Sequence, residues 1–111
     1  MNVLDFNKVE KASFNVALND ENNTNLKIYM PTKGTMDYLK NFRDKFSENN
    51  DSEAEEFMDE LYVACAKIMN RNADGIVIER QKIEELLDYE DLIMFYSAFM
   101  NFIDEVVNQK N

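Results

Sequence analysis

The sequence predicts an α+β fold, in which an N-terminal antiparallel β-hairpin or three-stranded meander packs on about four α-helices. Over residues 1–31, apolar residues alternate with polar ones, which is the period of a half-buried strand. After Pro31, apolar residues recur three or four positions apart, as in amphipathic helices. The chain has 111 residues, of which 45% are hydrophobic, and this size supports one packed core.

Three short apolar patterns mark the candidate strands. They are Leu4 and Phe6; Phe14, Val16 and Leu18; and Leu26, Ile28 and Met30. Between the last two patterns, the polar run at residues 19–25 is suited to a hairpin loop. We expect a single domain over residues 1–111, with a β-rich part at residues 1–31 and a helical part at residues 35–109, because neither part is long enough for a core of its own.

Capping residues mark the starts of three of the expected helices. Thr35 is placed to cap the first helix, Ser52 forms a capping box with Glu55 for the second, and Asp88 is placed to cap the last. The second helix has an apolar face opposite a set of carboxylates. That face consists of Phe57, Leu61, Ala64, Cys65 and Ile68, widened by Met58, Tyr62 and Met69. A short third helix follows, through Ile83, Leu86 and Leu87.

The composition excludes several classes of partner and chemistry. Twelve basic against twenty-two acidic residues give a formal net charge of −10, which argues against nucleic acid and anionic membranes, because both are bound through Lys and Arg. The chain has no His and one Cys, so His-based triads and an internal disulfide are excluded, and a zinc site built from thiolate or imidazole ligands is not expected. No signal peptide or membrane-spanning run is recognisable, so we expect a soluble protein of a reducing compartment with no cofactor.

The most specific local motif is Asn70-x-Asn72-x-Asp74-Gly75. It matches the first half of a calcium-binding loop, with oxygen ligands at positions one, three and five and the turn glycine at six. The second half does not match, because Gln81 stands where such a loop needs a bidentate carboxylate. The favoured alternative is a helix end, with Asn and Gly residues in left-handed conformations in a tight link.

The acidic stretch from Glu48 to Glu60 has seven carboxylates and no basic residue. Paired carboxylates can perform acid–base catalysis, and regularly spaced ones can mimic the charge of DNA, but a solvated helix face is the favoured explanation of this density. Cys65 lies on the apolar face of its helix and is expected to be a buried structural thiol, since no His can activate it. The sequence supplies no nucleophile, base and oxyanion site together, so we expect a non-enzymatic protein.

The last helix is apolar over about half of its circumference, which is more than a surface helix needs. Either it is a central helix that the sheet and the other helices contact on two sides, or one edge stays exposed until a second subunit or a partner covers it. The second interpretation places partner binding at Phe95, Phe99, Phe102 and Val106.

Roughly residues 50–110 resemble tail assembly chaperones of tailed phages and prophages of Gram-positive bacteria. The resemblance is carried by Ala66-Lys-Ile-Met-Asn-Arg-Asn-Ala-Asp-Gly75, by Ile83-Glu-Glu-Leu-Leu-Asp-Tyr-Glu-Asp-Leu92, and by a Phe-rich helix ending Phe102-Ile-Asp-Glu-Val106. It implies a non-enzymatic protein of the bacterial host cytoplasm that coats the tape measure protein and keeps it soluble while tail tube subunits polymerise. It carries over no catalytic residues and places partner contact on the apolar helices.

The expected partners are therefore the tape measure protein or other tail proteins, with a homo-oligomer left open and with no nucleic acid or membrane. The alternative function is that of a small acidic phage protein that acts as a DNA mimic or enzyme inhibitor by protein–protein binding. Tight binding to a basic DNA-binding enzyme would mark that alternative.

Overall fold

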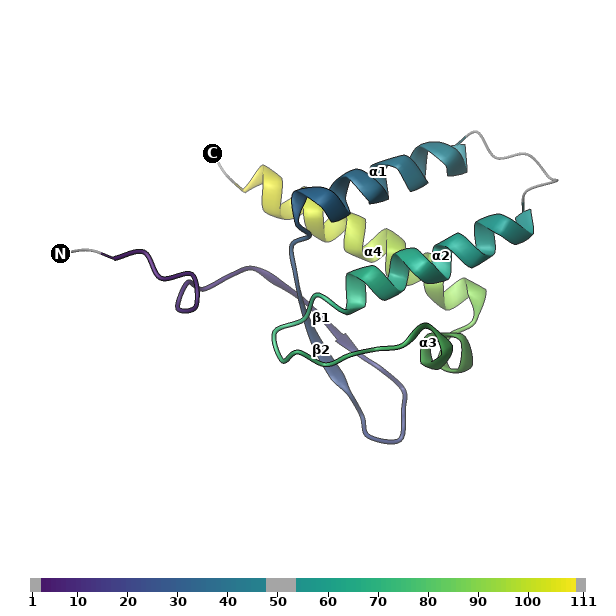
Figure 1. The fold of residues 1–111 in the computed structure, drawn as a ribbon, viewed down its shortest axis with the longest axis horizontal. Coiled ribbons are helices and arrows are strands. Elements are labelled where there is room, and N and C mark those ends of the chain that lie inside the picture. Colours follow the sequence, from purple (N-terminus) through teal and green to yellow (C-terminus); the bar gives the residue numbers. More distant parts are fainter. Residues whose placement is uncertain (1–2, 48–53, 110–111) are drawn as a thin grey trace.

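The computed structural model describes residues 3–47 and 54–109. In chain order its elements are the strands β1 (Ser13–Ala17) and β2 (Asn25–Tyr29) and the helices α1 (Lys33–Ser47), α2 (Ala54–Met69), α3 (Arg80–Leu86) and α4 (Tyr89–Asn108). The predicted α+β class, an antiparallel hairpin with four helices, is confirmed (Figure 1). Among the described residues, none of the helices combines the length and hydropathy needed to cross a membrane.

The hairpin alternates as the sequence predicts. In the antiparallel register, Phe14 lies opposite Ile28 and Val16 lies opposite Leu26. Leu26 and Ile28 are buried, and the two β1 side chains pack against the same core. The intervening position Asn15 is exposed, so one face of the hairpin covers the helices and the other faces water.

The second edge of β2 is bonded to the turn that follows α2. The Tyr29 amide donates to the Arg71 carbonyl at 3.1 Å, and the Ala73 amide donates to the Lys27 carbonyl at 2.9 Å. The Arg71 Nε also donates to the Met30 carbonyl at 2.6 Å. These bonds attach the hairpin to the helical part through backbone groups that an edge strand would leave unpaired.

The segment before β1 contains no strand, so the three-stranded alternative is wrong for the described part of the chain. Leu4 and Phe6 are each 69% exposed. A turn at Asp5 interrupts their alternating pattern, because the Asn7 amide donates to the Asp5 Oδ1 at 2.9 Å. Such an Asx turn locally satisfies a backbone group that a strand would place in a ladder.

Helix α1 begins earlier than the sequence predicts. The Thr35 amide donates to the Thr32 hydroxyl at 3.4 Å, and the Met36 amide donates to the Thr32 carbonyl at 2.8 Å. Thr32 therefore occupies the capping position, and the prediction of Thr35 was wrong by about one turn. Two hydroxyl residues three positions apart left the sequence ambiguous at this point.

Helix α4 begins at the predicted cap. The Asp88 Oδ1 accepts a hydrogen bond from the Asp91 amide at 2.8 Å, and the Asp91 carboxylate accepts one from the Asp88 amide at 3.0 Å. This reciprocal capping box satisfies two amides of the first turn. The capping box predicted for Ser52 with Glu55 lies partly outside the described residues, as does the acidic stretch from Glu48 to Glu60.

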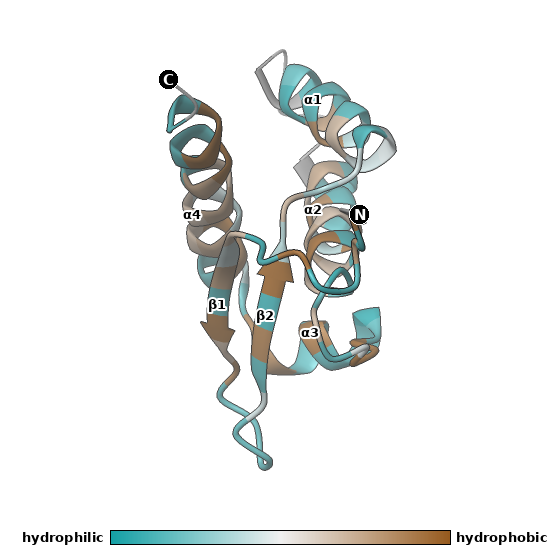
Figure 2. Cartoon of the chain, turned by 90° about the vertical axis from the view of Figure 1, so that its left-hand side faces the viewer, coloured by the Kyte–Doolittle hydropathy of each residue, from teal (hydrophilic) through white to brown (hydrophobic). Residues whose placement is uncertain are grey.

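The core joins the hairpin to all four helices in a single apolar cluster, and Figure 2 shows apolar residues on both strands and along α4. The predicted face of α2 is confirmed at its five buried positions, Leu61, Ala64, Cys65, Ile68 and Met69. The buried members of the cluster are Leu18, Leu26, Ile28, Leu39, Phe42, Leu61, Ala64, Cys65, Ile68, Met69, Ile78, Ile83, Leu92, Phe95, Phe99 and Ile103.

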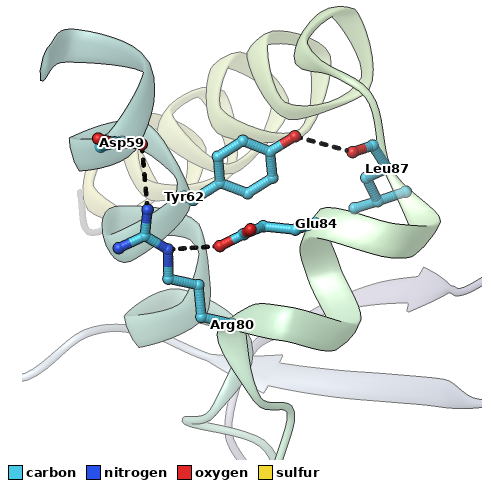
Figure 3. Close-up of polar contacts among 5 residues, drawn as sticks. All are labelled: Asp59, Tyr62, Arg80, Glu84 and Leu87. Atoms are coloured by element: carbon cyan, nitrogen blue, oxygen red, sulfur yellow. Dashed lines mark hydrogen bonds and ion pairs between the residues drawn. The ribbon is translucent and has the colours of Figure 1, made fainter. Parts of the chain in front are cut away.

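Polar contacts hold the short helix α3 against α2 (Figure 3). Arg80 at the start of α3 lies 3.2 Å from Asp59 of α2 and donates through Nε to Glu84 at 2.7 Å. The Tyr62 hydroxyl donates to the Leu87 carbonyl at 3.1 Å. An isolated helix of this length is unstable in water, so α3 depends on these contacts and on buried packing.

The loop of the hairpin is closed by one carboxylate. Asp20 accepts hydrogen bonds from the Thr24 amide at 2.8 Å and the Thr24 hydroxyl at 2.6 Å, and it lies 3.0 Å from the Lys82 Nζ of α3. The Thr24 hydroxyl, then the Thr24 amide and the Lys82 ammonium group, hold the pKa of Asp20 well below its usual range, against the opposing effect of burial. The fold therefore favours the ionised form of this side chain.

The Asp20→Asn variant is expected to unfold at a lower temperature at neutral pH and to lose less stability in acid. Because the folded state depresses the pKa of Asp20, its contribution is complete above the unfolded pKa of about 4 and is lost as the pH falls below that value. Thermal melts from about pH 7 to about pH 3 would measure this. The matched control is Glu21→Gln, an exposed neighbour in the same loop. Parallel pH profiles for wild type and Asp20→Asn would contradict the expectation.

Candidate partner-binding surface

The hairpin covers one side of α4 through Phe14. The centroid of its ring lies 6.1 Å from that of Phe95, 5.8 Å from that of Phe99 and 5.7 Å from that of Phe102. Neighbouring rings on α4 also contact each other, with centroids 6.4 Å apart for Phe95 and Phe99. Aromatic pairs at these separations stabilise a fold beyond the area that they bury.

A second aromatic cluster holds another side of α4 against α1 and α2. The ring of Tyr96 meets that of Phe42 edge-on with centroids 5.5 Å apart, and its hydroxyl donates to the Leu39 carbonyl at 3.5 Å. Phe42 stacks on Phe57 at 5.3 Å, and Tyr89 meets Phe57 edge-on at 6.2 Å. Helix α4 is thus contacted on two sides, which is the first of the two interpretations that its wide apolar surface allowed.

Two of the four predicted contact residues are core residues. Phe95 and Phe99 are 9% and 1% exposed, because Phe14 and the rest of the core cover them. The expectation that this edge stays exposed is therefore wrong for both. Phe102 and Val106 are half-buried, so part of each side chain stays accessible.

Further accessible apolar surface of α4 lies along a line that we name the outer line: Ile93, Met100 and Val107, of which Met100 also packs partly against the core. Ile93 is 40% exposed, Val107 is 56% exposed and Met100 is half-buried. Residues seven positions apart differ by only about 20° around a helix, so these side chains form one stripe along its length. Met94, which is also exposed, lies beyond this stripe on the outward face.

Charge on α4 is of one sign only. The helix carries the carboxylates Glu90, Asp91, Asp104 and Glu105 and no basic residue. All four are exposed, at the first and last parts of the helix. A partner that packs on the outer line therefore meets negative charge beside the apolar stripe.

The outer line was missed by sequence reasoning because periodicity treats the whole apolar sector of α4 as equivalent. The seven-residue spacing of Ile93, Met100 and Val107 was a signal that could have separated it from the Phe95–Phe99 side. Deciding which stripe the chain buries needs the position of β1, which periodicity does not supply.

The motif at residues 70–75 is a closed turn and not a calcium loop. The Asn70 Oδ1 accepts from the Ile78 amide at 2.8 Å, and the Asn72 Oδ1 accepts from the Ile76 amide at 2.9 Å. Two of the three side-chain oxygens that would bind calcium, those of Asn70 and Asn72, are therefore bonded to backbone amides. Gly75 has φ +66°, as the helix-end interpretation predicted, but Asn70 and Asn72 do not adopt positive φ. Within residues 3–47 and 54–109, no three acidic or thiol side chains are grouped to hold a metal ion.

Cys65 and the carboxylates of α2, the other candidate functional groups, have surroundings that give them a structural role. Cys65 is fully buried, and burial raises the pKa of its thiol to about 12, so the thiol is an unreactive, structural one. On α2, Glu60 lies 3.3 Å from Lys45 and Asp59 pairs with Arg80, while Glu55 is exposed. These carboxylates form a partly ion-paired solvated face.

One cleft of about 410 Å³ lies between the hairpin loop and α3. Its lining includes the carboxylates of Glu21, Glu79 and Glu85, beside the ion pair of Lys82 with Asp20. The lysine is engaged by that carboxylate, and the lining contains no thiol or hydroxyl side chain. The cleft therefore does not assemble a nucleophile with a base.

Comparison of the chain with protein-family models, with curated proteins and with solved structures finds no match.

Proposed function

We propose that this protein is a tail assembly chaperone that binds the tape measure protein of a tailed phage or prophage. The observation that carries the proposal is the outer line of α4, an accessible apolar stripe on a helix that is otherwise anchored in the core. The sequence resemblance over roughly residues 50–110 gives this surface its suggested partner. Because the predicted contact residues Phe95 and Phe99 are buried in the core, we propose the outer line as the contact surface instead.

Packing between helices supplies the proposed mechanism. A tape measure protein is long and helix-rich, so it presents amphipathic helices whose apolar stripes need cover until the tail tube surrounds them. Ile93, Met100 and Val107 repeat at the heptad interval, which matches the stripe of an amphipathic partner helix. The net charge of −10 would keep coated assemblies apart and in solution.

Carboxylates at both ends of α4 set the kind of partner segment that binds best. Glu90 and Asp91 at one end, with Asp104 and Glu105 at the other, favour a helix whose apolar stripe is flanked by Lys or Arg. Exposed charges of this kind chiefly raise the association rate and weaken with added salt. Binding of moderate strength would let the growing tube displace the chaperone.

The proposal is tested by co-expression with the tape measure protein of the same phage genome. Wild type is expected to yield a soluble complex, whereas the double variant Ile93→Asp, Val107→Asp is expected to bind about tenfold more weakly or worse, because it places two charges in the apolar contact. The soluble fraction and size-exclusion chromatography with light scattering measure this.

Asn101→Asp is the matched control, since it adds one charge at an exposed position of α4 away from the outer line. Circular dichroism melts check that each variant stays folded. A wild-type chain that leaves the tape measure protein insoluble would contradict the function. A double variant that still solubilises it would contradict the assignment of the surface.

A further inference from the structure

The outer edge of β1 is an open strand edge. In an antiparallel pair, backbone groups face the partner strand at alternate residues. The Leu18 amide donates to the Thr24 carbonyl at 2.8 Å, so in this register the backbone groups of Ser13, Asn15 and Ala17 face away from β2. Within the described part of the chain, no strand pairs with this edge.

The residues before β1 carry apolar side chains that are exposed among the described residues. We name residues 3–9 the arm. Val3 is 77% exposed, and Leu4 and Phe6 are each 69% exposed. Figure 1 shows the arm running away from the helices and the hairpin. With Val9, which is 39% exposed, four large apolar side chains of this one short segment remain in contact with water, which is unfavourable.

The side of α4 nearest to Phe14 is only half covered. Phe102 contacts Phe14 with ring centroids 5.7 Å apart, yet Phe102 and Val106 both keep part of their surface accessible. A further strand alongside β1 would place its inward side chains next to Phe14 and Val16, over this part of α4.

We propose that the arm of one copy of this protein adds as a third strand to the outer edge of β1 in a second copy. Leu4 and Phe6 are two positions apart, so in a strand they share one face and would cover Phe102 and Val106. The turn at Asp5 opens in this step, and its local hydrogen bonds are replaced by bonds to the outward groups of β1. The inference is independent of the proposed function.

The chain between the arm and β1 makes the arm more suited to pair with β1 of a second copy than with β1 of its own chain. From the last residue of the arm, Val9, to the first residue of β1, Ser13, the sequence contains no Gly, Pro, Asn or Asp, so a tight reversal there lacks the residues that hairpin turns need. The Lys11 Nζ lies 5.1 Å above the Tyr29 ring, which fixes this residue beside the end of β2.

Charge also favours a contact through the arm over a contact between the α4 helices of two copies. Within the arm, Asp5 and Lys8 cancel, so it brings no net charge to the edge of β1. Pairing two α4 helices along their outward faces would instead oppose four carboxylates to four more, without a basic residue on either helix.

Cross-linking between two single-cysteine variants tests the inference. Asn7→Cys in the arm and Asn15→Cys on β1 both replace exposed residues, and the native Cys65 is buried and does not compete. Mixing the two full-length variants under oxidising conditions is expected to give a covalent pair containing one chain of each. The control mixture pairs Asn7→Cys with Asn101→Cys on the outward face of α4, and it is expected to give at most about a tenth as much.

A second measurement follows self-association by light scattering as the protein is diluted. The Leu4→Asp, Phe6→Asp variant is expected to dissociate at concentrations about tenfold higher than wild type or more, with an unchanged melting curve of the folded chain. The inference fails if wild type is a monomer throughout. It also fails if Asn15→Cys alone gives the main cross-link, which would show two β1 edges pairing directly. A third variant carries both Asn7→Cys and Asn15→Cys in one chain. If its cross-link forms within that chain, the arm folds onto its own strand, and the inference fails.

Discussion

Replacing Phe99 with alanine is expected to lower the free energy of unfolding by about 3–5 kcal/mol. The side chain is 1% exposed, and its ring lies within 6.4 Å, centroid to centroid, of the rings of Phe14, Phe95 and Phe102. Truncation leaves a cavity at the junction of β1 and α4, where a rigid sheet and a long helix cannot both move to fill it. Urea unfolding followed by circular dichroism measures the loss.

Met94→Ala on the exposed face of the same helix is the control, and it should change stability by less than about 0.5 kcal/mol. Since small domains have only about 5–15 kcal/mol of stability, the Phe99 variant should be close to its limit at physiological temperature. A loss below about 1 kcal/mol would contradict the position of Phe99 in the core.

The second large effect is expected for Asn72→Ala, at about 2–4 kcal/mol. The Asn72 Oδ1 accepts from the amides of Asp74 and Ile76, and its Nδ2 donates to the carbonyls of Met69 and Ile76. Alanine leaves those backbone groups without their side-chain partner at the point where the chain turns back beside β2, and the part-buried groups, which water reaches least, carry most of the cost.

The variant Asn72→Asp has nearly the same shape as the native residue, so it separates the effect of lost hydrogen bonds on stability from the effect of lost side-chain volume. Aspartate keeps the Oδ1 acceptor but replaces the Nδ2 donor with a second oxygen, which faces the carbonyls of Met69 and Ile76, so it should destabilise about as much as alanine. Asp74→Ala, an exposed side chain in the same turn, is the control and should be nearly neutral. Equal melting temperatures for Asn72→Ala and Asp74→Ala would contradict the role given to the Asn72 amide.

The hairpin and the helical faces could be predicted because each follows from a local period. The alternation at Phe14 and Val16 and the apolar spacing on α2 both show which side of an element faces the core. This side can be found from residues that are close together in the sequence. The cap at Asp88 was equally local, since one side chain and the amide three residues later define it.

What could not be predicted depends on contacts between distant segments. Leu4 and Phe6 have the alternation of a strand, but a strand exists only when another strand pairs with it. Phe95 and Phe99 belong to the core, and not to a contact surface, because Phe14 from a distant part of the chain packs against them. The amides of Asn70 and Asn72 resemble metal ligands in the sequence, and their actual partners are backbone groups up to eight residues away.

The single cysteine makes this chain its own probe of opening motions. Cys65 lies at the centre of the core with a thiol pKa of about 12, so a thiol reagent can modify it only in molecules whose core has come apart. When reclosing outpaces the chemistry, the modification rate is proportional to the fraction of opened molecules, just as amide exchange is. The labelling kinetics of the unaltered protein would therefore report how often its helices separate under native conditions, without denaturant or an added label site.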